Sequence, residues 1–238
     1  VEDNLPYYAL ARSAVFDGDL DRMNEYTDYN QTQAFAPYNR EPQDPVFASL
    51  SRTPMLFAAH AITLGLNALS PSQAQNGFSF PYLFLTAVGD FLAVLIGCLA
   101  CFSLVARRVG GRYALFSVLA VVGGTNLLLF AYAWTGSSFQ PSFLLFAVFL
   151  NHWDKTRDDR SRADWLGAGV LLGLLGMTRT LNLGFAVIPL LDWSYDAVVR
   201  FKEAGSRAVA RHTGSGALLA LGMLLGFAFL ILPYLWGG

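Results

Sequence analysis

The sequence predicts an all-α membrane protein: a multi-pass transmembrane helical bundle preceded by an extracytoplasmic N-terminal segment. Hydrophobic residues make up 54% of the 238 residues, charged residues only 14%, and the mean hydropathy is +0.42, which is too apolar for an ordinary soluble domain. Residues 80–105, 113–134 and 215–236 each provide the roughly 20 apolar residues that a transmembrane helix needs. The 19 Phe, 10 Tyr and 5 Trp are typical of lipid contact and of interfacial aromatic belts.

The N-terminal part, residues 1–79, is expected to carry two helices that lie on the membrane surface. Residues 5–16 have a short amphipathic pattern, which ends at the turn Asp17-Gly18-Asp19. Residues 45–69 are apolar enough to touch lipid, although several polar residues interrupt them. A true span at 46–69 is the alternative, and it would invert the topology of everything that follows. Residues 80–238 form the transmembrane bundle.

Three shorter apolar runs lie within the bundle, at 141–153, 165–177 and 183–193. The last two are separated by a polar stretch that contains Arg179, so they form either one long span or two short helices that turn at this residue. A single span would leave Arg179 in mid-bilayer, at a cost of roughly 2.5–3.5 kcal/mol. We therefore predict two helices, which gives about six membrane helices in all. Residues 194–214 are then expected to form an amphipathic helix on the inner surface.

The distribution of Lys and Arg also favours two helices. Under this interpretation, eleven of the 16 basic residues fall on one side, in three short connections. The positive-inside rule makes that side cytoplasmic, places residues 1–79 outside, and locates the protein in the cell membrane. The eleven residues are Arg107, Arg108, Arg112, Lys155, Arg157, Arg160, Arg162, Arg200, Lys202, Arg207 and Arg211.

Several classes of function find no support in the sequence. The net charge is −1 and no basic stripe is present, so we expect no nucleic-acid partner. The chain has no P-loop, GxGxxG or Ser-His-Asp arrangement, and its three His residues are scattered. Cys98 and Cys101 lie inside an apolar run without other soft ligands, and we interpret them as reduced, buried thiols.

Two charges within the apolar segments are candidates for substrate binding. A charge at membrane depth is by default a functional hypothesis, and an arginine such as Arg179 suits bidentate contact with a phosphate. The alternative is a structural ion pair between Arg179 and Asp90, which lies about nine residues inside its span on the same side. Both interpretations remain open from the sequence.

The N-terminal segment is acidic, and its first acids are the candidates for chemistry. Residues 1–45 contain nine acids against three bases. Most of these acids fit a solvated loop. Asp3 differs because it directly precedes the membrane-surface helix that carries Tyr7, Tyr8 and Arg12. A carboxylate in that position could accept a proton from a hydroxyl, or hold a divalent cation beside a phosphate.

The same residues resemble a known family. The pattern D-x-x-x-Y-Y-x-x-x-R-S followed by D-G-D-L-D-x-x-N-E-Y is similar to the first extracytoplasmic loop of polytopic glycosyltransferases of the GT-C class. These include protein O-mannosyltransferases and bacterial enzymes that use polyprenyl-phosphate sugars. Residues 77–82 and 173–192 show a weaker similarity to the same group. The matching residues of the first loop are Asp3, Tyr7, Tyr8, Arg12, Ser13, Asp17, Gly18, Asp19, Leu20, Asp21, Asn24, Glu25 and Tyr26.

The resemblance implies an inverting transfer of sugar from a polyprenyl-phosphate donor to an acceptor hydroxyl at the extracytoplasmic face. It implies that Asp3, with Glu2 beside it, is the catalytic acid pair. A divalent cation is a candidate cofactor, with Asp3 as its ligand. Many members of the family carry an adjacent Asp-Glu pair, whereas this chain has Glu2-Asp3-Asn4, so either acid could act. The expected substrate-binding residues are Tyr7, Tyr8, Arg12, Arg179 and Asp90.

Other interpretations carry different expectations. A transporter or flippase half would show inverted repeats, and the sequence has none that we detect. In a non-catalytic membrane subunit the first-loop acids would scatter over the surface. The chain begins at Val1 and ends just after an apolar run, so we expect it to be an internal piece of a longer protein, preceded by at least one span.

Overall fold

A computed structural model of the chain describes residues 5–19, 24–25, 46–70, 74–132, 136–204 and 206–236. Within these residues the regular structure is entirely helical, as predicted, and contains no β-strand. The elements are α1 (Leu5–Phe16), α3 (Val46–Leu50), α4 (Thr53–Leu69), α5 (Phe80–Val109), α6 (Gly111–Gly124), α7 (Leu127–Tyr132), α8 (Phe139–Lys155), α9 (Arg162–Thr178), the 3₁₀ helix η2 (Thr180–Ala186), α10 (Val187–Ala204) and α11 (Ser206–Trp236).

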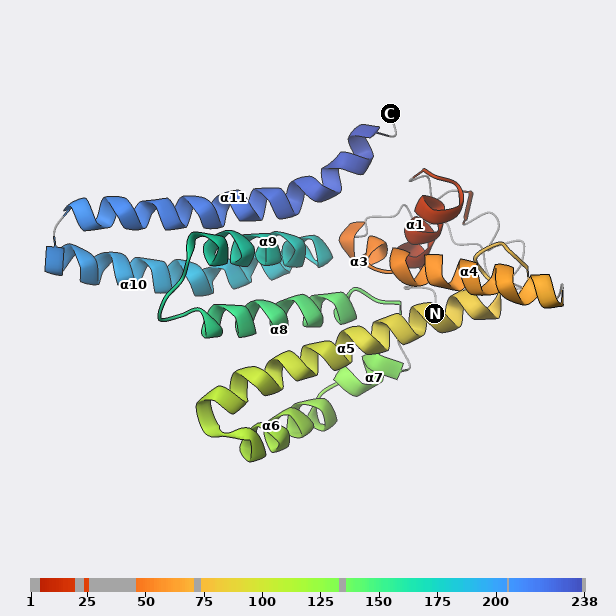
Figure 1. Cartoon of the computed structure of the whole chain (residues 1–238), viewed down its shortest axis with the longest axis horizontal. Coiled ribbons are helices and arrows are strands. Elements are labelled where there is room, and N and C mark those ends of the chain that lie inside the picture. Colours follow the sequence, from red (N-terminus) through yellow and green to blue (C-terminus); the bar gives the residue numbers. More distant parts are fainter. Residues whose placement is uncertain are drawn as a thin grey trace.

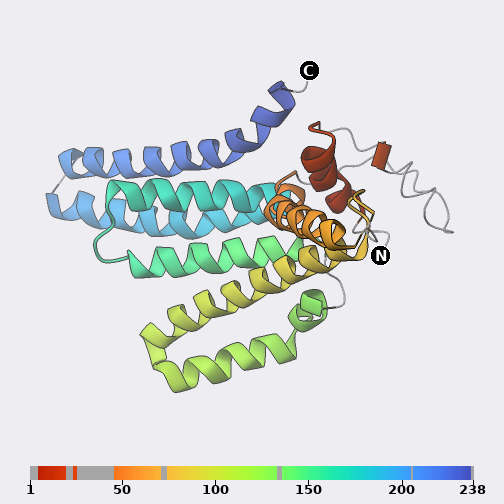
Figure 2. The same ribbon diagram turned by 45° about the vertical axis from the view of Figure 1, so that its right-hand side comes forward.

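The helices from α5 to α11 form an elongated bundle in which the chain runs back and forth along one axis (Figures 1 and 2). The pair α6–α7 returns beside α5, and α8, α9, α10 and α11 then alternate in direction. The connections α5–α6, α8–α9 and α10–α11 therefore share one end of the bundle. Helices α1, α3 and α4 lie at the opposite end, which we call the N-terminal end.

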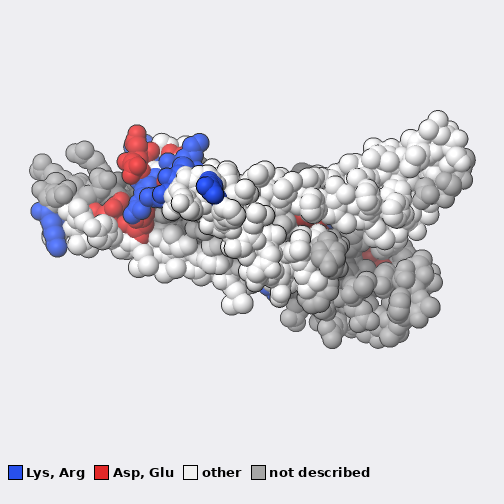
Figure 3. All heavy atoms as spheres, turned by 90° about the horizontal axis from the view of Figure 1, so that it is seen from below, with Lys and Arg blue, Asp and Glu red and all other residues white. Residues whose placement is uncertain are grey.

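Charged side chains gather at the end that contains the three connections, which we call the charged end (Figure 3). Asp154, at the end of α8, accepts hydrogen bonds from Arg107 and Arg108, at the end of α5. Arg160 pairs with Asp192 at 3.1 Å, and its guanidinium carbon lies 3.2 Å from the centre of the Trp153 ring. These contacts hold α5, α8 and α10 together at the charged end of the bundle.

The turn predicted at Arg179 is present. A capping box begins α9, because the Ser161 hydroxyl accepts from the Asp164 amide while the Asp164 carboxylate accepts from the Ser161 amide. The helix ends at Thr178, and Arg179 is extended, with φ −160° and ψ 130°. Residues after Arg179 form η2, and α10 then returns toward the charged end (Figure 1).

Three other predictions of element boundaries differ from the structure. Residues 113–134 are not one continuous helix, because α6 ends at Gly124 and α7 begins at Leu127. The sequence Gly123-Gly124-Thr125-Asn126, at the end of α6 and just after it, is rich in poor helix formers, and this accounts for the break. Residues 194–214 are not a separate amphipathic helix, since α10 continues to Ala204 and α11 begins at Ser206. Residues 45–69 are divided into α3 and α4, whereas helix 5–16 is confirmed as α1.

Helices α9 and α11 pack backbone against backbone through glycines spaced four residues apart. A Cβ atom added at Gly169 would lie 2.2 Å from the Leu219 carbonyl oxygen, and one at Gly173 would lie 2.4 Å from that of Met223. On the facing helix, a Cβ atom at Gly222 would lie 2.3 Å from the Leu166 carbonyl oxygen. Such a small-xxx-small contact is typical of helices that associate within a membrane.

One helix among the described residues, α5, is both long enough and apolar enough to cross a membrane. Only 22% of its most apolar stretch is buried, whereas the core helix of a soluble protein is mostly buried. Two further apolar helical stretches, Gly111–Gly124 and Thr213–Ala228, are shorter. The exposed large side chains of α5 include Phe84, Phe91 and Leu99.

Candidate functional site

The predicted substrate-binding residues Tyr8 and Arg12 hold α1 against residues 74–82. The Tyr8 hydroxyl donates to the Gly77 carbonyl, and burial raises the pKa of Tyr8 above its usual range. Arg12 Nε donates to the Asn76 carbonyl at 2.8 Å. The Arg12 guanidinium also lies 5.2 Å from the centre of the Phe78 ring. The two residues thus make contacts within the protein. We call Tyr8, Arg12, Asp17 and Glu25 together the α1 clamp.

Two acidic residues of the first-loop pattern, Asp17 and Glu25, complete this clamp. Arg12 Nη1 lies 2.9 Å from Asp17 Oδ2 and 2.8 Å from Glu25 Oε1. Glu25 is fully buried, and its second oxygen has no hydrogen-bond partner among the described residues. Burial first, and then a hydrogen bond with Asp17, raise the pKa of Glu25 to about 7, although Arg12 opposes the shift. These acids therefore converge on one arginine.

A second polar group lies at the start of α8, inside the N-terminal end of the bundle. Arg52 Nη2 lies 3.3 Å from Asp90 Oδ1 and donates to the Ser137 carbonyl at 2.7 Å. Arg52 Nη1 donates to the Ala48 carbonyl at 2.5 Å. Asp90 accepts from the Gly136 amide at 2.5 Å. A single buried ion pair thus connects the α3–α4 joint, α5 and the loop before α8.

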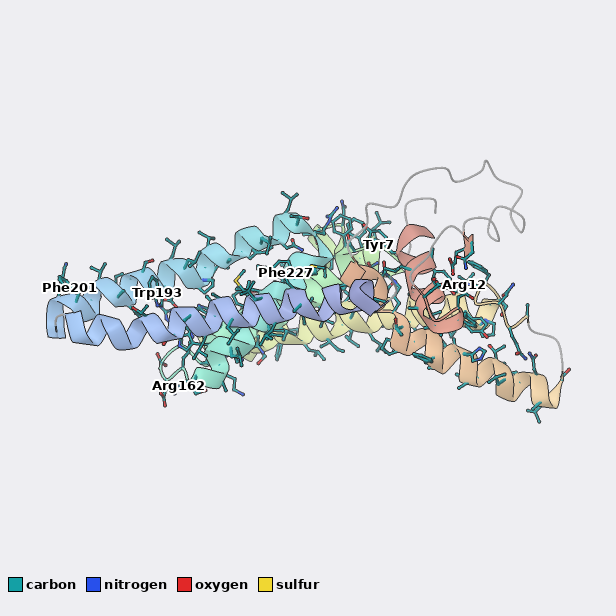
Figure 4. All side chains as sticks on the ribbon, turned by 90° about the horizontal axis from the view of Figure 1, so that it is seen from above. Tyr7, Arg12, Arg162, Trp193, Phe201 and Phe227 are labelled. Carbon is teal, nitrogen blue, oxygen red and sulfur yellow. The ribbon has the colours of Figure 1, made fainter. Side chains whose placement is uncertain are left out.

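Tyr7 and Arg179 contact Ser138 and Phe139, the two residues that follow Ser137 in the chain. The Tyr7 hydroxyl lies 3.5 Å from Ser138 Oγ, at the outer limit of a hydrogen bond. The Arg179 guanidinium carbon lies 4.2 Å from the centre of the Phe139 ring. Helix α1 and the end of α9 also meet through apolar contacts, since Leu10 of α1 packs against Met177 of α9. Figure 4 shows Tyr7 and Arg12 far from Arg162 and Trp193, at the opposite end of the molecule.

Three uncharged polar side chains join α8 to the turn at Arg179. Ser142 Oγ donates to Thr178 Oγ1 at 2.7 Å, and the Asn182 amide donates to both, at 3.2 and 3.0 Å. Thr178 is fully buried. Because these bonds fix the residues on either side of Arg179, they hold the backbone from which the guanidinium extends.

The structure therefore brings together some of the predicted residues and not others. Tyr7, Arg179 and Asp90 all lie around the start of α8, although Asp90 pairs with Arg52 and not with Arg179. Tyr8 and Arg12 belong to the α1 clamp. Glu2 and Asp3 lie outside the described residues, immediately before α1.

Arg52 is the residue that the sequence interpretation missed. It is one of the polar residues that interrupt the apolar stretch 45–69. The available signal was its relation to Asp90, because no Asp, Glu, Lys or Arg occurs between the two residues. Two charges that bracket a long uncharged segment are strong candidates for each other's partner when that segment folds back on itself.

The described residues bring together no group of three His, Cys, Asp or Glu side chains that could hold a metal ion. The predicted cation ligand, Asp3, falls outside them. Comparisons of the chain with protein-family models, curated proteins and solved structures gave no match. The geometry and the residues themselves therefore carry the functional argument.

Proposed function

We propose that the chain is part of a multi-pass membrane glycosyltransferase of the GT-C kind. It would transfer sugar from a polyprenyl-phosphate donor to an acceptor hydroxyl at the extracytoplasmic face. The observation that carries the proposal is the placement of Tyr7 and Arg179 on either side of Ser138 and Phe139. Helix α1 and Arg179, which are far apart in sequence, thus share one end of the bundle.

Three features support a membrane bundle with several spans. The first is the exposed apolar surface of α5, and the second is the close glycine contact between α9 and α11. The third is the gathering of basic connections at the charged end (Figure 3), which the positive-inside rule assigns to the cytoplasm of the cell. Residues 1–79 would then be extracytoplasmic, and the protein would lie in the cell membrane.

Arg179 would bind the phosphate of the donor. Its side chain is half-buried, stacks on Phe139, and has no carboxylate within ion-pair distance in the part of the chain that the structure describes. A guanidinium without a carboxylate partner has donors available for an anion. Two phosphate oxygens could accept hydrogen bonds from it at once.

The transfer itself requires little more from the protein. The acceptor oxygen would bond to the anomeric carbon while the bond from that carbon to the phosphate oxygen breaks. The acceptor proton would pass to Asp3, or to Glu2 beside it, and the lipid phosphate would leave as an anion stabilised by Arg179. A divalent cation held by Asp3 is compatible with this scheme, and no step of it depends on one.

The test is a transfer assay on the full-length protein in liposomes, with a polyprenyl-phosphate sugar as donor. We expect Asp3→Asn and Arg179→Ala to lose at least about a hundredfold in rate, because each removes a charge used at the reacting centre. Arg162→Ala, which changes an exposed arginine at the charged end, is the matched control and should retain the rate. Unchanged turnover in Asp3→Asn would remove the catalytic assignment.

Topology can be tested separately with an impermeant maleimide and single cysteines in a chain lacking Cys98 and Cys101. Thr180 and Ser161 are both exposed and lie at opposite ends of α9. We expect a cysteine at Thr180 to react from outside the cell, and one at Ser161 only after the membrane is permeabilised. Labelling of both from the same side would reject the turn at Arg179 as an extracytoplasmic element.

A further inference from the structure

The segment between Arg52 and Asp90 is an uncharged helical hairpin. Its two helices are α4 and the first third of α5, and the sequence between Arg52 and Asp90 contains no Asp, Glu, Lys or Arg. Contacts between the two helices follow an antiparallel order. Arg52 pairs with Asp90, a Cβ atom at Gly89 would meet the Met55 side chain, and His60 Nδ1 lies 2.9 Å from the Tyr82 hydroxyl.

This order shows that α4 runs beside α5 along the axis of the bundle, as Figure 1 also shows. A helix that lay flat on a membrane would cross α5 at a steep angle, and its contacts would be confined to one short stretch. Here they extend from Arg52 to His60, over about two helical turns. This order favours an orientation of α4 along α5 over the surface-lying orientation expected for residues 45–69.

One face of the hairpin is covered and the rest is bare. Tyr8 and Ala11 of α1 pack with Leu56 and Ala59 of α4 and with Tyr82 of α5. The remaining surface, which we call the bare face, exposes large apolar side chains on both helices. Its residues, with exposed fractions, are Phe57 56%, Ile62 47%, Leu64 45%, Leu66 45%, Leu69 87%, Phe80 73%, Leu83 50% and Phe84 53%.

On α5 the bare face continues into the candidate membrane span. Phe80, Leu83 and Phe84 are followed at helical spacing by the exposed residues Phe91, Leu95 and Leu99. The apolar stripe is therefore uninterrupted from the tip of the hairpin to the middle of α5. No charged or exposed polar residue separates Leu95 and Leu99 from Phe84 along this stripe, so the same apolar medium can contact all three.

Helix length fixes how deep the hairpin lies. The 30 residues of α5 extend about 45 Å, close to the full thickness of a bilayer with its headgroups. With Arg107 and Arg108 at the inner headgroups, Phe80 reaches the outer headgroups. Asp90 is ten residues further in, or roughly 15 Å, which is within the acyl region. The start of α4 lies at the same depth, because Arg52 pairs with Asp90.

We propose that the first half of α4 enters the outer leaflet together with α5, and that lipid acyl chains cover the part of the bare face that contains Phe57, Leu83 and Phe84. The absence of charge and the continuous stripe on α5 favour lipid over water or a charged protein surface. The inference rests on the membrane orientation proposed above and is independent of catalysis. It places the Arg52–Asp90 pair below the outer headgroups, where the pair is buried against Ala48, Gly136 and Ser137.

The test uses nitroxide spin labels at single cysteines in liposomes, in the full chain lacking Cys98 and Cys101. Collision with oxygen reports lipid, and collision with a water-soluble nickel chelate reports water. We expect oxygen collision to exceed nickel collision severalfold at Phe57 and Phe84, and the ratio to fall steadily through Ile62 to Leu69. Leu95 is the control for lipid, and Gln75, exposed near the hairpin tip, is the control for water.

Each alternative gives a distinct result. High nickel collision at Phe57 and Phe84 with Leu95 in lipid would overturn the inference and leave the membrane bundle intact. Low collision with both reagents at these two positions would also overturn it, because a protein surface would then cover the bare face. High nickel collision at Leu95 as well would reject the membrane orientation itself.

Discussion

Arg52 and Asp90 form a buried ion pair at the base of the α4–α5 hairpin, with Nη2 and Oδ1 3.3 Å apart and both side chains almost inaccessible. Their remaining hydrogen bonds go to backbone groups at Ala48, Gly136 and Ser137. The pair thus fixes the loop from which Ser138 meets Tyr7 and Phe139 meets Arg179. A displacement at Arg52 would be transmitted to both sides of the candidate site.

Removing one partner of this pair is expected to cost more than removing both. Asp90→Leu alone leaves Arg52 buried without its counter-charge, and we expect a loss of about 3–5 kcal/mol in stability. In the double variant Arg52→Met/Asp90→Leu, neither charge of the pair remains, and much of that loss should be recovered. Thermal unfolding in detergent, compared across the two single variants and the double variant, measures the difference.

The reverse order would contradict this interpretation. If the double variant were less stable than either single one, by about the sum of their effects, the two residues would contribute independently. The exposed pair formed by Arg108 and Asp154 provides a control, because Arg108 is largely solvent-exposed. Arg108→Ala should change stability by less than about 1 kcal/mol.

Local signals made most of the helices predictable. The range of α1 follows from an apolar pattern that ends at Asp17-Gly18-Asp19, and Gly18 has the positive φ of 72° that such a turn uses. The turn at Arg179 follows from the cost of a charge in lipid. What the sequence could not show was pairing. Asp90 faces Arg52 only because α4 folds back along α5, a relation that depends on the whole hairpin.

The same limit applies to the first-loop pattern. Composition indicated a wet acidic segment, but Arg12 was assigned to substrate because its ion pairs with Asp17 and Glu25 depend on how residues 17–25 fold over α1. The Gly169 and Gly173 contact with α11 was also missed. Their spacing is visible in the sequence, but glycines are common in apolar helices. Only the structure shows that Gly222 of α11 faces them and allows the two backbones to approach closely.

Glu25 is expected to make the α1 clamp more stable as the pH falls toward 5. Its pKa in the folded chain is about 7, above the ordinary value, so the folded state binds the proton more tightly than the unfolded state does. The stabilisation is complete below the ordinary pKa and is lost as the pH rises through about 7. Hydrogen exchange of α1 amides should therefore be slower at pH 5.5 than at pH 8, after correction for intrinsic rates.

Glu25→Gln is the matched variant for that effect. An amide keeps the shape of the side chain but cannot titrate, so the additional protection at low pH should disappear. Asp19→Asn, which alters an exposed acid that accepts a bond from Ser13, should keep the pH dependence. An unchanged pH profile in Glu25→Gln would show that another group is responsible.

Gly77 and Gly18 both have positive φ angles, of 82° and 72°, but only at Gly77 would an added side chain meet a residue of the clamp. A Cβ atom at Gly77 would lie 2.9 Å from Arg12 Cγ, whereas one at Gly18 meets nothing within 4 Å. Gly18→Ala should therefore cost only the backbone strain of roughly 1–2 kcal/mol. Gly77→Ala should cost that strain and also displace Arg12. Protease cleavage after Arg12 should accelerate in Gly77→Ala and much less in Gly18→Ala.

The glycine contact between α9 and α11 should be intolerant of the smallest addition. A methyl group at Gly169 or Gly222 would meet backbone carbonyl oxygens at 2.2 and 2.3 Å, which cannot move aside as a flexible side chain can. We expect Gly169→Ala and Gly222→Ala each to lower stability by about 1–3 kcal/mol through overpacking. Gly123→Ala, in α6, has open space at the same position and should be neutral or stabilise by up to about 1 kcal/mol. Thermal unfolding of the three variants in one detergent separates the effects. Equal midpoints for Gly169→Ala and Gly123→Ala would show that α9 and α11 do not approach as closely as the structure has them.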